Sequence, residues 1–321
     1  SYSVYDGKTW SGPYPVLKSY TCDEICTVVY EDELYLFHWT HDNPISEVLC
    51  QVYNGSRWVE AVWIPRDTTR GGISAVVYNE QIWCFSNDLH GQLRYDIFNG
   101  GWWEPGHTVA DVSGKLTGGS LVGYLGKTYF FYRSLRKTAE LCYHVYDGST
   151  WSAEMIVPGG KGLSGNPAAG FDEGKIYCFY HGPNSDGTLH VNVFDVDGTS
   201  WSGDTDITLL NGIYRSPAAV FYNNTLWCVS QAASMDRLCF QIPRLPKSTI
   251  HGSLPSEGIT GDHQVEVLDG KLYCWYFHQQ SSRKCHSVSV GRQWREEKDV
   301  FLASDNTSKF WAVSADFTLY H

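Results

Sequence analysis

The sequence has little of what several protein classes require. It contains only two methionines. It has no run of 18 apolar residues, so we expect no transmembrane helix. Lysine and arginine number 24 against 35 carboxylates, and no basic stripe offsets the net charge of -11. Because such a chain repels phosphate groups, we expect neither nucleic acid nor a membrane as a partner.

Local motifs of catalysis are also missing. The chain has no H-E-x-x-H, no C-x-x-C, no G-x-S-x-G and no phosphate-binding loop. Asp195 and Asp197 precede Gly198 as in a calcium loop, but the later carboxylate ligands are absent. The sequence therefore predicts no metal and no cofactor.

Aromatic residues are abundant, and they repeat. With 13 Trp, 21 Tyr and 14 Phe, the composition is typical of packed strands rather than of helices or disorder. Aligning the chain with itself gives seven copies of a repeat of about 48 residues, the last one weak. The aligned aromatics are Tyr35, Trp83, Tyr129, Tyr177, Trp227, Tyr273 and Tyr320.

Each repeat is typical of a four-stranded antiparallel blade. Two short apolar runs flank a turn such as Asp269-Gly270, and a third run leads through an aromatic-D/N-G-x-x-W turn into a fourth. In that turn Asp or Asn with Gly provides the positive φ, and we expect the Trp to fill the wedge between blades. These tryptophans are Trp10, Trp58, Trp102, Trp151, Trp201 and, in a degraded copy, Trp294.

The repeats predict one all-β domain over residues 1–321, a seven-bladed β-propeller of four-stranded antiparallel blades. The chain begins with the second half of a repeat and ends with the first half of one. We therefore expect the strand at Tyr2 to Tyr5 to pair with the strand at His321 and close the ring.

The ten cysteines allow two interpretations. They could be buried thiols of a cytosolic protein. They could also be disulfides, since Cys228 and Cys239 are 11 residues apart across one hairpin and Cys22 lies close to Cys26, although spacing cannot give the connectivity. Cys274 and Cys285 repeat the first spacing, and glycosylation sequons stand at Asn54, Asn223 and Asn306. The paired interpretation, with these sequons, predicts a secreted or endoplasmic-reticulum glycoprotein.

Candidate functional residues lie where a propeller has the mouth of its central channel, on the turns leading into the inner strands and at the ends of the second strands. As catalytic donors we expect Arg70, Arg215, His263 and Tyr214. As substrate-binding residues we expect Trp39, His38, Tyr180, His181, Tyr276, Asp262, Trp311 and Phe310. Any one of them could be a solvated loop residue or a packing aromatic. As a set they differ from blade to blade while the scaffold repeats, which favours one asymmetric pocket.

The segments GNPAAGF (165–171), KIYCFYHG (175–182) and RSPAAVF (215–221) resemble the seven-bladed lectin-like propellers of bacteria and fungi, including the fucose-binding type. The resemblance spans the whole chain and is carried by scaffold residues, so it implies the fold more than an activity. Those lectins bind sugars between blades through an Arg, an acidic or amide group and a stacking aromatic. This sequence does not repeat such a triplet from blade to blade.

The divergent, cysteine-containing repeat also looks like that of fungal hetero-Diels-Alderases of tropolone sesquiterpene biosynthesis. That resemblance implies a single apolar pocket that joins an o-quinone methide to a humulene-type alkene without a cofactor. Catalysis would come from holding both reactants in a reactive pose and from hydrogen bonds to the electron-poor heterodiene.

We therefore expect a secondary-metabolite enzyme that takes a small hydrophobic or aromatic ligand. The alternative is a secreted lectin of the fucose type that binds glycans between blades, and a third possibility is a scaffold for protein partners. The sequence leaves the oligomeric state open.

Overall fold

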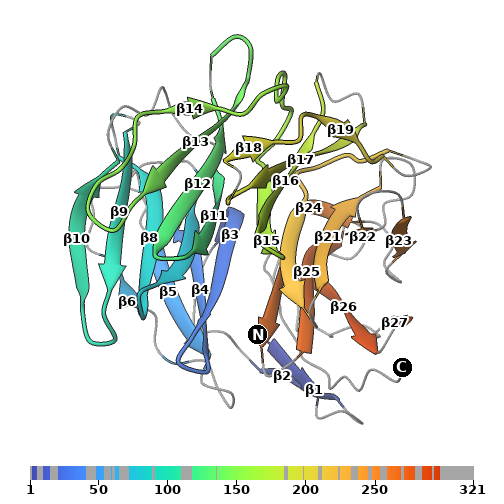
Figure 1. Ribbon diagram of the computed structural model, residues 1–321. Coiled ribbons are helices and arrows are strands. Elements are labelled where there is room, and N and C mark those ends of the chain that lie inside the picture. Colours follow the sequence, from blue (N-terminus) through green and yellow to red (C-terminus); the bar gives the residue numbers. More distant parts are fainter. Residues whose placement is uncertain are drawn as a thin grey trace.

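Antiparallel strands make up the structure, and the predicted four-stranded unit is confirmed (Figure 1). This computed structural model describes residues 2–5, 10–14, 21–40, 48–53, 59, 62–64, 72–88, 90, 92–109, 118–134, 136–183, 187–197, 199–208, 212–222, 225–232, 238–244, 248–253, 259–268, 271–278, 284–290 and 293–296. In this part of the chain no helix is long and apolar enough to cross a membrane.

The first three complete sheets follow the chain in order. One consists of β3 (Thr21–Tyr30), β4 (Glu33–Thr40), β5 (Val48–Tyr53) and β6 (Val62–Trp63). The next consists of β7 (Ser74–Tyr78), β8 (Gln81–Asn87), β9 (Leu93–Phe98) and β10 (Trp103–Thr108). The third consists of β11 (Gly119–Tyr124), β12 (Lys127–Arg133), β13 (Leu141–Tyr146) and β14 (Met155–Ile156).

Three further sheets complete the set. One has β15 (Ala168–Asp172), β16 (Lys175–His181), β17 (Leu189–Asp195) and β18 (Ser200–Trp201), with β19 (Thr205–Asp206) also paired to β17. The next has β20 (Ala218–Tyr222), β21 (Thr225–Gln231), β22 (Leu238–Arg244) and β23 (Ser248–Ser253). The last has β24 (Ile259–Leu268), β25 (Lys271–His278), β26 (Lys284–Val290) and β27 (Gln293–Glu296).

The described residues form six complete sheets, and the predicted seventh blade is not confirmed. The first strands β3, β7, β11, β15, β20 and β24 follow one another as neighbours, and β24 packs directly against β3. A seventh inner strand would have to stand between those two. The short strands β1 (Tyr2–Tyr5) and β2 (Trp10–Tyr14) pair with each other as a separate sheet. Their predicted partner strand at His321 lies outside the described residues.

Where burial is described, the second strand of a sheet is strongly buried because neighbouring sheets cover both of its faces. In β8 every residue after Gln81 is buried, and in β12 the five central residues are buried. These strands are continuous apolar runs, the pattern expected of strands without a solvent face. The core therefore consists of the layers between adjacent sheets rather than of one central cluster.

Tryptophans fill the wedges between sheets, as predicted. Trp151 packs edge-on against Phe85 of the preceding sheet at 5.8 Å, and Trp201 packs on Phe131 at 6.1 Å. The prediction is wrong for Trp102, which is 67% exposed. Its neighbour Trp103 takes the wedge instead, 5.9 Å from Phe37.

The predicted disulfide between Cys228 and Cys239 is absent. The strand register places Cys228 opposite Gln241 and Cys239 opposite Ser230, so the two side chains are not paired across the strands. Cys228 is a fully buried free thiol. Cys50, Cys142 and Cys178 are also buried free thiols, and burial raises the pKa of each, that of Cys142 to about 12. All four fit the first interpretation of the cysteines, as core thiols.

Gly119 is required by the close approach of β11 to β12. A Cβ there would lie 2.6 Å from the ring of Phe130 and 2.7 Å from the carbonyl oxygen of Phe131. Because the backbone of β12 would have to shift to make room, we expect Gly119→Ala to lower the free energy of unfolding by about 1–3 kcal/mol, measured by urea denaturation.

Gly123, on the same strand, is the matched control. A Cβ there meets nothing within 4 Å, so Gly123→Ala should be neutral or stabilising by up to about 1 kcal/mol. Equal losses in both variants would contradict this account of the packing.

Candidate functional site

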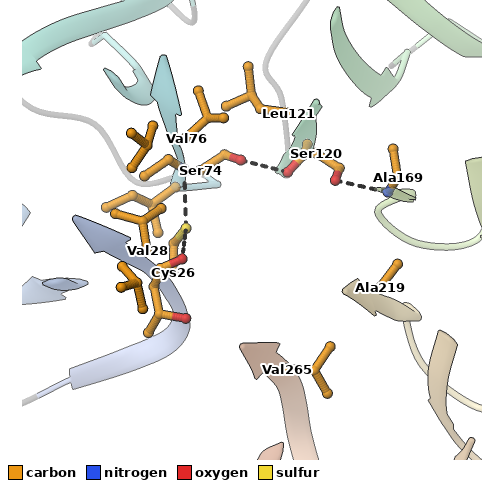
Figure 2. Close-up of a pocket in the computed structure, with 15 residues that line it drawn as sticks. Cys26, Val28, Ser74, Val76, Ser120, Leu121, Ala169, Ala219 and Val265 are labelled. Carbon is orange, nitrogen blue, oxygen red and sulfur yellow. Dashed lines mark hydrogen bonds between the residues drawn. The ribbon is translucent and has the colours of Figure 1, made fainter. Parts of the chain in front are cut away.

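The central channel holds a cavity of about 330 Å³ (Figure 2). All six inner strands contribute to its wall, and most of the side chains are small and aliphatic. Those from successive strands are Val28, Val76, Leu121, Ala169, Ala219 and Val265. The cavity expected at the hub is therefore present, but among the described residues no aromatic side chain and no candidate residue lines it.

Polar side chains at the hub join neighbouring inner strands. The Ser74 hydroxyl donates to the Gly119 carbonyl at 2.8 Å, and the Ser120 hydroxyl accepts from the Ala169 amide at 2.9 Å. The Cys26 sulfur accepts from the Ala75 amide at 3.1 Å. Each inner strand is also the edge of its own sheet, so one side of its backbone has no strand partner within that sheet. A channel of this kind suits water better than a flat hydrophobic substrate.

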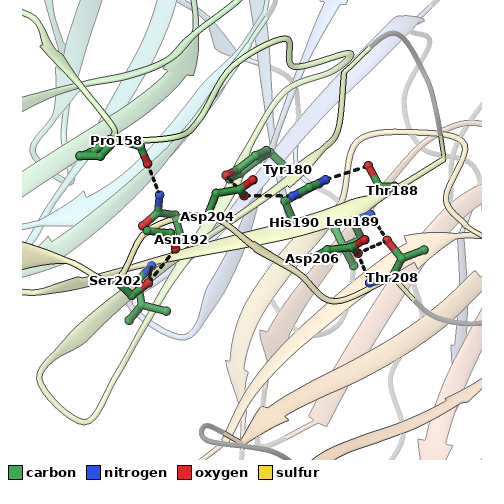
Figure 3. Close-up of polar contacts among 12 residues, drawn as sticks. Pro158, Tyr180, Thr188, Leu189, His190, Asn192, Ser202, Asp204, Asp206 and Thr208 are labelled. Atoms are coloured by element: carbon green, nitrogen blue, oxygen red, sulfur yellow. Dashed lines mark hydrogen bonds and ion pairs between the residues drawn. The ribbon is translucent and has the colours of Figure 1, made fainter.

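Tyr180, a predicted substrate-binding residue, is buried and engaged (Figure 3). Its hydroxyl donates to Asp204 Oδ1 at 2.5 Å, and the same oxygen lies 2.9 Å from His190 Nδ1. The His190 ring stacks on Tyr180 at 5.6 Å. Burial and the adjacent Asp204 raise the pKa of Tyr180 well above its usual value.

The preceding sheet has the same arrangement. Tyr132 donates to Glu154 Oε2 at 2.5 Å, and its hydroxyl lies 3.2 Å from His144 Nε2. A buried tyrosine bonded to a carboxylate thus occurs at aligned positions of two neighbouring sheets. We assign Tyr180 that structural role.

His38 and His181 are also interior residues. They lie near the ends of β4 and β16 and are 0% and 2% exposed. Both would need the sheets to separate before a ligand could reach them, so neither is at a surface site.

Six other candidates cannot be assigned to a site. Trp39, Tyr276 and Asp262 lie on β4, β25 and β24, with side chains outside the described set. Arg70, Phe310 and Trp311 lie outside the described residues altogether.

The remaining three candidates, Tyr214, Arg215 and His263, come together between two sheets. Tyr214 and Arg215 precede β20, where the Tyr214 amide donates to the Gln231 carbonyl at 2.9 Å. The Tyr214 ring is 62% exposed, and the Arg215 guanidinium carbon lies 5.6 Å from its centre. His263 belongs to the next sheet, on β24, and is close enough to Arg215 for the guanidinium charge to lower its pKa.

His263 is held in one tautomer at this junction. It is buried, and its Nε2 lies 3.0 Å from the Val229 carbonyl oxygen. Because a carbonyl oxygen only accepts, Nε2 carries the proton and Nδ1 is an acceptor. Nδ1 has no hydrogen-bond partner among the described residues. Burial and, to a lesser extent, Arg215 lower the pKa of His263 to about 4 against the bond to Val229, so the ring is neutral at pH 7.

Sequence reasoning missed Gln231, whose backbone holds Tyr214 in place. Its position at the end of β21 aligns with His181 at the end of β16, which was selected. The aligned position was therefore the available signal. Among the described residues, no three His, Cys, Asp or Glu side chains come together in a group that could hold a metal.

His263 should make stability depend on pH. Its folded pKa of about 4 lies below the ordinary 6.5, so the unfolded chain binds the proton more readily and stability falls as pH drops from 6.5 to 4. The loss from this group is on the order of 3 kcal/mol.

Urea denaturation at pH 7 and pH 4.5 tests this. The positions aligned with His263 in the first two sheets are Ile25 and Ile73, so His263→Ile is a suitable variant. We expect its stability to change less between the two pH values than that of the wild type. An unchanged pH dependence in the variant would refute the assignment.

No family model matches the chain, and no curated protein matches it in sequence. Solved structures do. A variant of Aleuria aurantia lectin in complex with Fucα1-6GlcNAc has a TM-score of 0.64 at 12% identity over 88% of this chain and 97% of that one. SapL1 lectin in complex with α-methyl fucoside gives 0.60 at 14% identity over 87% and 96%.

Two more neighbours are weaker. A mutant of AofleA from Arthrobotrys oligospora has a TM-score of 0.58 at 12% identity over 92% of this chain and 89% of that one. NanB sialidase from Streptococcus pneumoniae gives 0.57 at 10% identity over 84% and 68%. At these identities the likeness shows the fold alone: a propeller similar to fucose-binding lectins.

Proposed function

We propose that this protein is a lectin that binds a glycan at the junction of the β20–β23 and β24–β27 sheets. The observation that carries the proposal is the exposed Tyr214 ring with the Arg215 guanidinium beside it, at a junction between sheets. The fold similarity to fucose-binding lectins supports it. Fucose-containing glycans are therefore the first ligands to test.

Tyr214 and Arg215 offer the two contacts that a saccharide needs. An exposed aromatic ring provides a flat apolar wall for the C–H face of a sugar. A guanidinium is planar and presents five N–H donors, which suits pairs of neighbouring hydroxyl or ring oxygens. The guanidinium carbon lies over one face of the Tyr214 ring, 5.6 Å from its centre, so a sugar would stack on the opposite face and take hydrogen bonds from Arg215 at the ring edge.

His263 is a positioning residue beneath this pair. Its neutral ring is fixed by the Val229 carbonyl and does not repel Arg215 at pH 7. Protonation near pH 4 would place a second positive charge beside the guanidinium. Glycan affinity should therefore be constant from pH 8 to about 5.5.

The site is expected once per chain. Hairpin registers align the sheets, and the other five positions equivalent to Arg215 are Asp23, Gly71, Thr117, Gly165 and Gly261. Those equivalent to His263 are Ile25, Ile73, Gly119, Pro167 and Pro217. The combination of aromatic, guanidinium and imidazole therefore occurs at one junction.

Calorimetric titration with Fucα1-6GlcNAc or methyl α-L-fucoside tests the proposal. We expect one equivalent bound per chain and a loss of roughly tenfold or more in affinity for Tyr214→Ala, about 1.4 kcal/mol. Arg215→Lys should also weaken binding, because it keeps the charge but loses the planar donors.

Trp102→Ala is the matched control, since Trp102 is an equally exposed aromatic on another sheet. It should leave affinity unchanged. Several equivalents of glycan bound per chain, or equal losses of affinity for Trp102→Ala and Tyr214→Ala, would refute the single-site proposal. No binding to any glycan on an array would refute the lectin proposal.

The hetero-Diels-Alderase remains a prediction. It requires an aromatic-walled pocket, whereas the hub cavity has small aliphatic walls and backbone edges. The lectin has the better support from the described residues.

A further inference from the structure

The turns between the first and second strands form a face of the propeller that the glycan site does not use. We define this inner-hairpin face by the turns Glu31–Asp32, Asn79–Glu80, Leu125–Gly126 and Glu173–Gly174, together with the nearby strand residues Val77 and Phe221. It lies at the end of the channel where the inner strands finish, opposite the end where they begin.

Neighbouring turns on this face are fixed to one another. The Tyr30 hydroxyl donates to the Glu80 carbonyl at 2.9 Å, and the Tyr78 hydroxyl donates to the Gly126 carbonyl. Tyr124 stacks on Phe171 of the next sheet at 4.1 Å. The face is therefore a preformed surface, which lowers the entropy cost of binding.

Apolar side chains are exposed at this end of the inner strands, and one of them, Val77, also lines the hub cavity. Val77 is 37%, Phe221 46% and Leu125 76% exposed. Three of the six large hydrophobic residues exposed among the described residues thus lie at this one end of the inner strands. Val77 and Leu125 belong to adjacent sheets, whose turns the Tyr78 hydroxyl joins, and adjacent exposed apolar side chains are typical of interaction sites. Phe221 lies two sheets further around the ring.

Leu125 is the most informative of them. Its φ of 47° is left-handed, a conformation that favours Gly, Asn or Asp and is costly for leucine. Its side chain packs against little, because it is largely exposed. Leu125 therefore helps neither the turn nor the core, and a residue held at a cost to the fold indicates function.

Three of the four turns carry carboxylates at their tips. Glu31, Asp32, Glu80 and Glu173 are exposed at the turn tips, and all four have positive φ. The exposed ammonium groups beside the described turns belong to Lys127 and Lys175. The face is thus apolar and acidic, in a chain of net charge -11.

We propose that the inner-hairpin face binds a basic protein segment that carries an aliphatic or aromatic anchor. The anchor would pack on Leu125 and Val77, and its flanking Lys or Arg side chains would meet Glu80 and Glu173. A second copy of this chain is a poor occupant, because two acidic faces repel. An anionic membrane is disfavoured for the same reason.

Fluorescence polarisation with synthetic peptides tests this at physiological salt. The probes are an alternating Lys/Leu peptide, an alternating Glu/Leu peptide and a Lys/Ser peptide of equal length. We expect the Lys/Leu peptide to bind at least tenfold more tightly than either other peptide. Glu80→Gln combined with Glu173→Gln should weaken its binding about tenfold and reduce its salt dependence.

Leu125→Asn separates binding from folding. Asn before Gly126 suits the left-handed turn, so this variant should raise the midpoint of thermal unfolding while weakening the Lys/Leu peptide about tenfold. Ile156→Asn is the matched control, since Ile156 is 46% exposed on β14, away from the face.

Three results would overturn the proposal. They are equal binding of the Glu/Leu peptide, an equal loss for Ile156→Asn, and no binding of any peptide at millimolar concentration. Concentration-dependent dimerisation that Leu125→Asn abolishes would identify a second copy as the occupant instead. Glycan titration of Leu125→Asn should be unchanged, so failure here and failure of the lectin proposal are distinguishable.

Discussion

Close packing of the inner strands around one axis is the constraint on which the rest of the structure depends. Adjacent strands approach closely enough for Ser74, Ser120 and Cys26 to bond the backbone of the next strand. Gly119 shows how little space is left, since even a Cβ would strike the backbone. The sheets then diverge outward, and aromatic residues such as Trp151 and Trp201 fill the wedges.

That constraint also decides where a ligand can bind. Small side chains and backbone edges line the hub, so the described residues offer no flat aromatic wall there. The buried second strands are committed to packing, which explains why Tyr180 and His181 are interior. Chemistry that differs from sheet to sheet is left to the turns, such as the one with Tyr214 and Arg215 and the one with Leu125. There the fold tolerates an exposed aromatic ring or a strained leucine.

Much of the fold could be predicted from the sequence, because turn-forming residues recur at the same positions of each repeat. The hairpins, the four-stranded unit and the wedge positions of Trp151 and Trp201 were predictable. The ring size was not, since half-repeats at both ends imply a seventh blade while contact between β3 and β24 depends on packing geometry. In the site, a two-residue period cannot show which of Tyr180 and Tyr214 is buried. The predicted disulfide between Cys228 and Cys239 was wrong, because a spacing of residues along the chain does not determine the register of β21 and β22.

The central claim is that the ligand binds between sheets, at the one junction where Tyr214, Arg215 and His263 meet, and not in the hub. Crystals soaked in Fucα1-6GlcNAc test this most directly through difference density. The account predicts one saccharide per chain, stacked on Tyr214 and within hydrogen-bond distance of Arg215. Density inside the channel, or at several junctions equally, would contradict it.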